Sequence, residues 1–195
     1  MKKLSLLLAV LFTASFGVSA QDVWKFDVAH SNIKFNVEHL VISEVSGQFK
    51  AFDGELKASN EDFSGSEISF TIEVNSIDTE NEKRDGHLKS DDFFSAEKFP
   101  NITFVGKALE KVDGKKYKLT GDLTIRDVTK TVELDVKYGG TIKDPWGNTK
   151  AGFKISGSIN RFDYGLKWNN AMEAGGLVVG EDVEIICNVE LQKQS

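Results

Sequence analysis

The sequence predicts an all-β fold, namely an antiparallel up-and-down β-barrel of about eight strands, with a short helical or loop cap near residues 81–100. Apolar and polar residues alternate over most of the chain, which is the pattern of strands with one buried face. The links between these stretches are mostly short, as in hairpins. The chain has only two prolines, as expected for long strands with tight turns. A sandwich of shorter strands is the alternative.

The individual strands follow from the alternation in chain order. In the third one, apolar residues shift from odd positions at Phe49 to even positions at Phe52, so we expect a bulge near Ala51 that bends the strand. Asp113-Gly114 predicts a hairpin turn. The expected strands span residues 23–28, 33–38, 45–58, 68–74, 102–108, 117–125, 132–138, 153–159 and 183–191.

The first twenty residues have the pattern of a secretory signal peptide. A basic start at Lys2 is followed by the apolar run Leu4–Phe16 and by small residues at Val18–Ala20. This run is too short to predict a membrane span, and no cysteine follows it to carry a lipoprotein anchor. We therefore expect residues 1–20 to be a cleaved signal peptide and residues 21–195 to be one domain, periplasmic or secreted.

Charge and cysteine content limit the classes of partner. The formal net charge is −6 and the pI about 5.2, so no basic patch predicts nucleic-acid binding or attachment to an anionic membrane. Cys187 is the single cysteine, which excludes a disulfide within the chain. It falls at an inward strand position, where a small buried side chain is expected and a catalytic thiol is the alternative.

The regular alternation stops over Arg84–Phe104. This run contains two adjacent aromatics, Phe93 and Phe94, as well as Leu88 and Phe99. Because so much apolar surface is untypical of a solvated linker, we expect a folded cap over one end of the barrel.

Small residues fall at inward positions between large apolar ones. A barrel of about eight strands is either filled by its side chains or just wide enough for one small ligand. Missing side chains on the inner wall favour the hollow barrel, whereas glycines that only let neighbours pack closely would fit a filled one. The inward small residues are Gly47, Gly106, Ala108, Gly121 and Gly157.

No motif predicts catalysis or metal binding. The histidines His30, His39 and His87 lack zinc-ligand spacing, so structural roles are expected. A Ser-His-Asp arrangement could be assembled from Ser31, His87 and Asp91 or Asp92, but the chain has no G-x-S-x-G motif. We expect no catalytic residue, no metal and no cofactor.

Two arginines and several loop aromatics are weaker candidates for a site. Arg84 and Arg126 could hold a phosphate, although surface ion pairing is the simpler interpretation. Trp146, Trp168 and Tyr164 lie in expected loops, where they either rim a ligand mouth or anchor the loops.

Six runs, in order along nearly all of residues 21–195, resemble the YceI-like family of exported lipid-binding proteins. The resemblance implies a lipocalin-like barrel whose apolar interior holds an elongated lipid, such as an isoprenoid quinone or polyprenyl phosphate. One departure is Arg126-Asp127, where many relatives have His-Gly. The runs are Asp27–Leu40, Val45–Leu56, Arg84–Phe104, Leu119–Val136, Ile159–Leu166 and Val178–Ile185.

We therefore expect an exported, non-enzymatic carrier or reservoir for a polyisoprenoid or similar apolar lipid. An enzyme acting on such a lipid through His87, or a filled barrel serving as a stress-response or interaction module, are the alternatives. A homodimer through exposed loop aromatics is possible. The predicted ligand-binding residues are Phe35, Val37, Phe70, Ile72, Phe104, Leu119, Leu134, Phe153, Ile155 and Ile185 in the wall, and Phe94, His87, Arg84 and Trp168 at the mouth.

Overall fold

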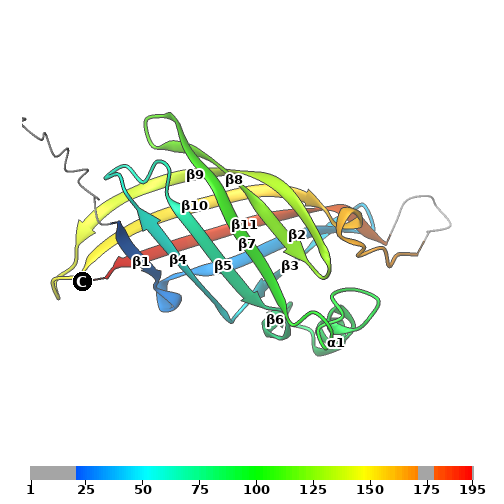
Figure 1. Ribbon diagram of the computed structural model, residues 1–195. Coiled ribbons are helices and arrows are strands. Elements are labelled where there is room, and N and C mark those ends of the chain that lie inside the picture. The colour runs from blue at the N-terminus through cyan, green and yellow to red at the C-terminus, as the bar shows by residue number, and fades with distance from the viewer. Residues whose placement is uncertain (1–20, 171–177, 195) are drawn as a thin grey trace, which may run out of the picture.

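A computed structural model describes residues 21–170 and 178–194, and most of them lie in strands (Figure 1). The predicted signal peptide lies outside the described residues. Within them, the only α-helix, α1, is too short and polar to cross a membrane. The elements are β1 (Asp22–Phe26), η1 (Val28–His30), β2 (Asn32–His39), β3 (Ser43–Phe49), β4 (Phe52–Ala58), β5 (Glu67–Glu73), η2 (Val74–Ser76), β6 (Ile77–Asp78), α1 (Glu82–Lys89), β7 (Asn101–Asp113), β8 (Lys116–Ile125), β9 (Val128–Lys143), β10 (Thr149–Asn160), η3 (Arg161–Tyr164) and β11 (Val179–Lys193).

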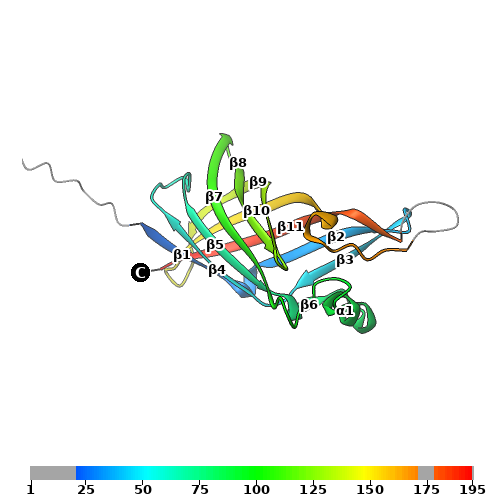
Figure 2. The same ribbon diagram turned by 45° about the vertical axis from the view of Figure 1, so that its right-hand side comes forward.

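The strands form a closed antiparallel barrel, as the sequence predicts. Going round the barrel, the order is β1-β4-β5-β7-β8-β9-β10-β11, and β1 pairs with β11 to close the ring of eight. The strands β2, β3 and β6 continue this wall on the other part of β11. Because β1 and β2 lie end to end along β11, each acts as half of one long wall strand (Figures 1 and 2).

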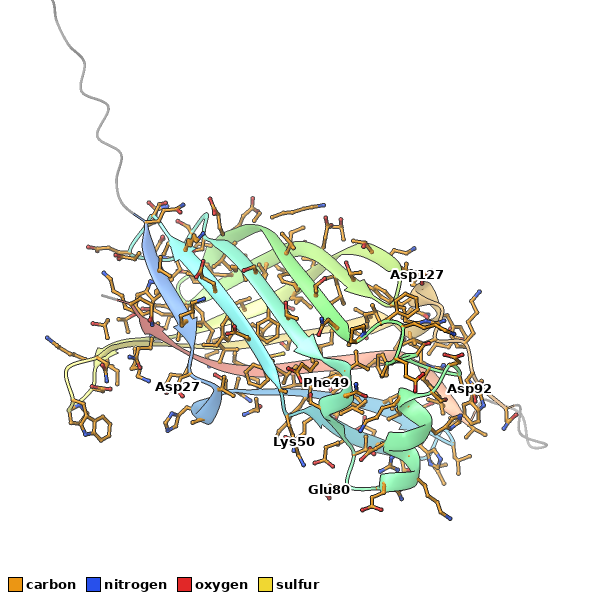
Figure 3. All side chains as sticks on the ribbon, turned by 60° about the horizontal axis from the view of Figure 1, so that its bottom comes forward. Asp27, Phe49, Lys50, Glu80, Asp92 and Asp127 are labelled. Carbon is orange, nitrogen blue, oxygen red and sulfur yellow. The ribbon has the colours of Figure 1, made fainter. Side chains whose placement is uncertain are left out.

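The expected third strand is divided where the parity of its apolar residues changes. β3 ends at Phe49, β4 begins at Phe52, and both of these aromatics are buried. β3 pairs with β2, whereas β4 pairs with β1. The expected bend is therefore present beside Lys50, but as a complete break in the pairing rather than as a bulge (Figure 3).

A bulge in β7 shows that the prediction of an inward position for Ala108 is wrong. The register of β7 against β8 shifts between Gly106 and Ala108. The shift turns Leu109, which is only 3% exposed, into the barrel in place of Ala108. Because the residues at this bulge include Gly106 and Ala108, which are small, the alternation of apolar and polar residues does not predict it.

One end of the barrel is closed by aromatic side chains. Phe63, in the β4–β5 loop, is 2% exposed and lies 5.1 Å from the rings of both Trp24 and Phe153. It has a φ of +63°, which is uncommon for a bulky residue and shows that its surroundings hold it in place. Tyr117 and Tyr138 complete the closure.

The opposite end carries the predicted cap. The side chain of Asn81 caps α1 by accepting a hydrogen bond from the backbone N–H of Arg84. After the helix, a series of turns buries Phe93 and Ala96 against the barrel. Figure 3 places Asp92 near α1, Asp127 at the same end but away from the helix, and Asp27 toward the other end.

Candidate functional site

The candidate site is an apolar cavity of about 150 Å³ inside the barrel. No charged, amide or hydroxyl side chain lines it. Several inward side chains in its wall, including Phe70, Ile155 and Cys187, are only half-buried because the cavity leaves part of their surface uncovered. In another protein, an apolar cavity of about this volume stays dry and binds benzene. The space therefore fits an apolar group about the size of one ring.

The inward glycines are recesses for neighbouring side chains rather than gaps in the wall. A Cβ atom added to Gly121 would lie 2.2 Å from Cζ of Phe104, and one added to Gly157 would lie 2.5 Å from Cδ2 of Leu134. Phe35 covers Gly47 in the same way. The glycines thus let large side chains lie close to the wall, which keeps them out of the centre of the barrel. Glycines that let neighbouring side chains pack closely were expected of a filled barrel. In this barrel the glycines have that role, and a cavity is nevertheless present.

Most of the predicted wall residues line this cavity. They are Phe70, Ile72, Phe104, Leu119, Leu134, Phe153, Ile155 and Ile185. Phe35 and Val37 do not line it. They follow Ile33, a lining residue, on the same face of β2 and lead toward the cap end. Whether any of these residues contacts a ligand stays a prediction.

Further residues of the same strands line the cavity but were not among those predicted. Most could have been found by extending each inward face to its full length, because they share the parity of residues that were named. Leu109 could not, since the β7 bulge reverses the parity there. The additional residues are Phe26, Ile33, Leu56, Ile68, Leu109, Leu123, Val132, Val136, Cys187, Val189 and Leu191.

We call the half-buried apolar side chains between the cavity and the cap the neck: Phe35, Val37, Phe94 and Ile159. Phe94 reaches down from the cap, and its ring centroid lies 6.0 Å from that of Phe49. The far end of the barrel, in contrast, is closed by fully buried rings such as Phe63. The less tightly packed neck makes the cap end the better route into the cavity.

The other predicted mouth residues lie outside the cavity, His87 and Arg84 on the cap and Trp168 in the segment after η3. The His87 ring packs edge-on against Phe93 and Trp168, at centroid distances of 5.1 and 4.8 Å. Its Nε2 lies 2.8 Å from Oδ2 of Asp92. Arg84 donates from Nε and Nη2 to the hydroxyl and the carbonyl oxygen of Thr79, so two sides of its guanidinium are engaged by the protein.

Comparison with known proteins identifies the family. The YceI-like domain matches residues 24–191. The chain belongs to the YceI-like family. It is 41% identical over 166 residues to UPF0312 proteins of two Staphylococcus aureus strains, MSSA476 and MW2, a match that covers 85% of this chain and 94% of each relative.

Solved structures of similar proteins share this barrel. A YceI protein of Campylobacter jejuni, 35% identical, matches with a TM-score of 0.70 over 81% of this chain and 90% of its own. BcnA of Burkholderia cenocepacia has 23% identity, a TM-score of 0.74, and coverage of 85% of this chain and 98% of its own. A polyisoprenoid binding domain from Saccharophagus degradans, implicated in plant cell wall breakdown, has 17% identity, a TM-score of 0.63, and coverage of 88% and 98%.

The cap of this YceI-like protein is fastened by Arg126. Arg126 lies in the β8–β9 turn with a φ of +57°. Its Nη1 donates to the carbonyl oxygens of Phe93, 3.2 Å away, and Gly165, 3.3 Å away, and its guanidinium lies 5.6 Å from the ring of Phe99. The side chain therefore joins the turn, the cap and the segment after η3, rather than forming the expected surface ion pair.

The segment after η3 is held by a buried arginine. Arg161 is 3% exposed and donates to the carbonyl oxygens of Leu166, Trp168, Val179 and Gly180. Its burial lowers the pKa of the guanidinium. Nearby, burial raises the pKa of Tyr164 to about 12. Tyr164 is an anchor of this loop and not part of an exposed rim.

A second pocket, of about 360 Å³ and lined by both polar and apolar residues, lies toward the end opposite the cap, beside the exposed Trp146. Asp27, His30 and Glu190 bring one possible ligand atom each within 4.8 Å of one another. Lys150 Nζ already lies 2.5 Å from Asp27 Oδ2 and 3.2 Å from Glu190 Oε1. Because this ammonium group occupies the position of a cation, the cluster is an internal ion pair and does not indicate a metal site.

Proposed function

We propose that this YceI-like protein is a carrier or reservoir for an elongated apolar lipid of the polyisoprenoid class, held with its chain inside the barrel. The observation that carries the proposal is the closed barrel around a cavity with a wholly apolar lining. A prenyl chain has no hydrogen bonds to satisfy, so such a wall meets all its needs. The polyisoprenoid binding domain from Saccharophagus degradans supports the ligand class through its shared fold.

The cavity accommodates the end of the chain, and the neck accommodates the rest. About 150 Å³ suits one ring-sized group and is too small for a long lipid. In our proposal the half-buried neck side chains Phe35, Val37 and Phe94 move apart as the ligand enters from the cap end. A polar head group then remains at the cap, since the cavity offers it no partner.

The structure favours binding over catalysis. An enzyme acting on the lipid needs an acid–base pair that reaches the bound chain. His87 and Asp92 are hydrogen-bonded, but both lie on the outer surface of the cap and neither lines the cavity. We also propose that the protein is exported, on the basis of the signal-peptide pattern in residues 1–20.

Cys187 provides the sharpest test of the cavity. We expect Cys187→Phe to place a ring in the space meant for the ligand, while Cys187→Ala leaves that space open. The measurement is native mass spectrometry after incubation with a prenyl quinone, with circular dichroism to confirm folding. Wild type and Cys187→Ala should carry the lipid, and Cys187→Phe should show occupancy at least about tenfold lower, as a filled pocket predicts.

Two outcomes would contradict the proposal. Equal occupancy in Cys187→Phe would place the ligand outside the cavity. A wild-type protein that purifies bare and shows no mass shift with any added prenyl lipid would favour a filled barrel with an interaction role.

A further inference from the structure

The turn between β2 and β3 exposes more apolar surface than a hairpin turn needs. Ile42 is 86% exposed and Val41 is 55% exposed. The three turn residues, Leu40–Ile42, are uncharged, large and aliphatic, whereas turns of this kind usually contain Gly, Asn or Asp. We call Leu40–Ile42 the tip.

The backbone of the tip is strained. Leu40 has a φ of +55° and Val41 a φ of +62°. For a β-branched residue this is a genuine outlier, because its Cβ substituents crowd the backbone. Strain of this kind persists only where the surrounding structure holds it, and it is common at functional sites. The Val41 and Ile42 side chains of this turn are exposed to solvent.

The tip lies at the end of the barrel through which we propose that the ligand enters. Figures 1 and 2 place the β2–β3 turn at the same end as α1 and opposite the C-terminal end of β11. The strand that leads to the tip carries the neck residues Phe35 and Val37. Leu40 is fixed to the start of β11 by a backbone hydrogen bond to Val178, so the tip has a defined position relative to the neck.

From these observations we infer that the tip is a membrane-contacting element that inserts Val41 and Ile42 into the apolar layer of a lipid bilayer during lipid transfer. The inference rests on the proposed function, because an apolar cargo must be collected from a membrane and delivered to one. Two side chains bury fewer carbons than a myristoyl chain, which itself binds membranes only marginally and reversibly. The contact is therefore transient, as transfer requires.

The charges beside the tip specify the kind of membrane surface. Glu38 and Glu44 face each other directly across the two strands at the base of the tip. Two carboxylates there oppose an approach to anionic lipid. The tip therefore suits a zwitterionic surface and gains nothing from anionic head groups.

The test compares Ile42→Asp with Val112→Asp. Val112 is a matched control because it is also exposed, at 62%, but lies near the β7–β8 turn at the opposite end of the barrel. Each protein is loaded with a dansyl-labelled farnesyl chain, and its transfer to phosphatidylcholine vesicles is followed by stopped-flow fluorescence. We expect transfer to be at least about tenfold slower for Ile42→Asp and within about twofold of wild type for Val112→Asp, with the equilibrium Kd of the farnesyl probe unchanged in both.

Flotation of the unloaded proteins with vesicles tests the tip without any cargo. At millimolar phosphatidylcholine we expect a small fraction of wild type and Val112→Asp to float with the vesicles, a smaller fraction of Ile42→Asp, and less wild type to float with phosphatidylglycerol. Unchanged transfer and flotation for Ile42→Asp would overturn the inference, as would stronger recruitment to phosphatidylglycerol. If Ile42→Asp instead converts a dimer to a monomer in sedimentation, the tip is a contact between copies. Failure of wild type to bind the probe, with flotation as expected, would count against the proposed cargo and not against the tip.

Discussion

At the scale of single residues, Arg161 is the clearest case of a side chain whose role the sequence does not reveal. An arginine in a loop is expected at the surface, yet this one is buried and bound by four carbonyl oxygens. Its guanidinium supplies several donors in a fixed plane, which lysine or methionine cannot do. It thereby fixes Leu166 and Trp168 to the start of β11.

We expect Arg161→Met to lower the free energy of unfolding by at least about 3 kcal/mol, because each buried carbonyl left without a donor costs about 1–3 kcal/mol. Arg161→Lys should lose less, since it keeps one or two of the hydrogen bonds. Urea denaturation measures both, with Lys167→Met as the exposed neighbouring control. A loss below about 1 kcal/mol for Arg161→Met would show that the carbonyls find other donors, such as water.

At the scale of elements, the glycines of β8 and β10 show how strand positions differ in their tolerance of a side chain. A Cβ at Gly121 would meet the Phe104 ring and, at 2.7 Å, the carbonyl oxygen of Val105. A Cβ at Gly157 would closely approach only one methyl of Leu134, which can rotate. At Gly152, on the same strand as Gly157, the space is open.

Alanine substitutions should therefore follow a definite order of stability. We expect Gly121→Ala to cost about 1–3 kcal/mol, since ring and backbone must both move. Gly157→Ala should cost less and push the Leu134 methyl toward the cavity, while Gly152→Ala should be neutral or stabilising by up to about 1 kcal/mol. Urea unfolding of the three variants gives the order. Equal stability of all three would mean that the recesses have no role in packing.

At the scale of the whole molecule, one ion-pair cluster helps to close the barrel. Asp27 follows β1, Lys150 lies on β10 and Glu190 on β11, so their contacts join the first wall strand to the last two. The hydrogen bond from Lys150, assisted by His30, lowers the pKa of Asp27 from 3.8 to about 2, although desolvation opposes this. The carboxylate form is thus favoured in the folded state.

This cluster predicts how stability depends on pH. Because the folded state lowers the pKa of Asp27, its contribution is present at neutral pH and is lost as the pH falls from about 4 to about 2. Allowing for partial exposure, the contribution is about 1–2 kcal/mol. Asp27→Asn should be less stable than wild type by this amount at pH 7, and most of the difference should be gone near pH 2, with the rest lost below it.

The control for the pH prediction is Asp22→Asn, which removes a more exposed ion pair with Lys193. We expect it to change stability by less than about 0.5 kcal/mol. Thermal unfolding across the pH range gives the comparison. A difference between Asp27→Asn and wild type that persists at pH 2 would show that Asp27 stabilises the fold as a hydrogen-bonding group and not through its charge.

The sequence by itself determined the all-β class, an antiparallel barrel of about eight strands and a bend near Ala51, because the alternation of apolar residues records which side of each strand is buried. It also identified most of the cavity wall, since residues of one parity share one face. The cap was visible as an apolar interruption of the alternation.

Only the tertiary structure decided how these faces meet. Three features depend on neighbours from other parts of the chain. They are the β7 bulge that turns Leu109 rather than Ala108 inward, the aromatic rings that lie over Gly47 and Gly121, and the carbonyl oxygens around Arg161. Alternation reports which face of a strand is inward, but not the distance between inward faces. Whether the barrel keeps space at its centre therefore follows from cross-strand packing, and that is fixed only when the ring of strands closes.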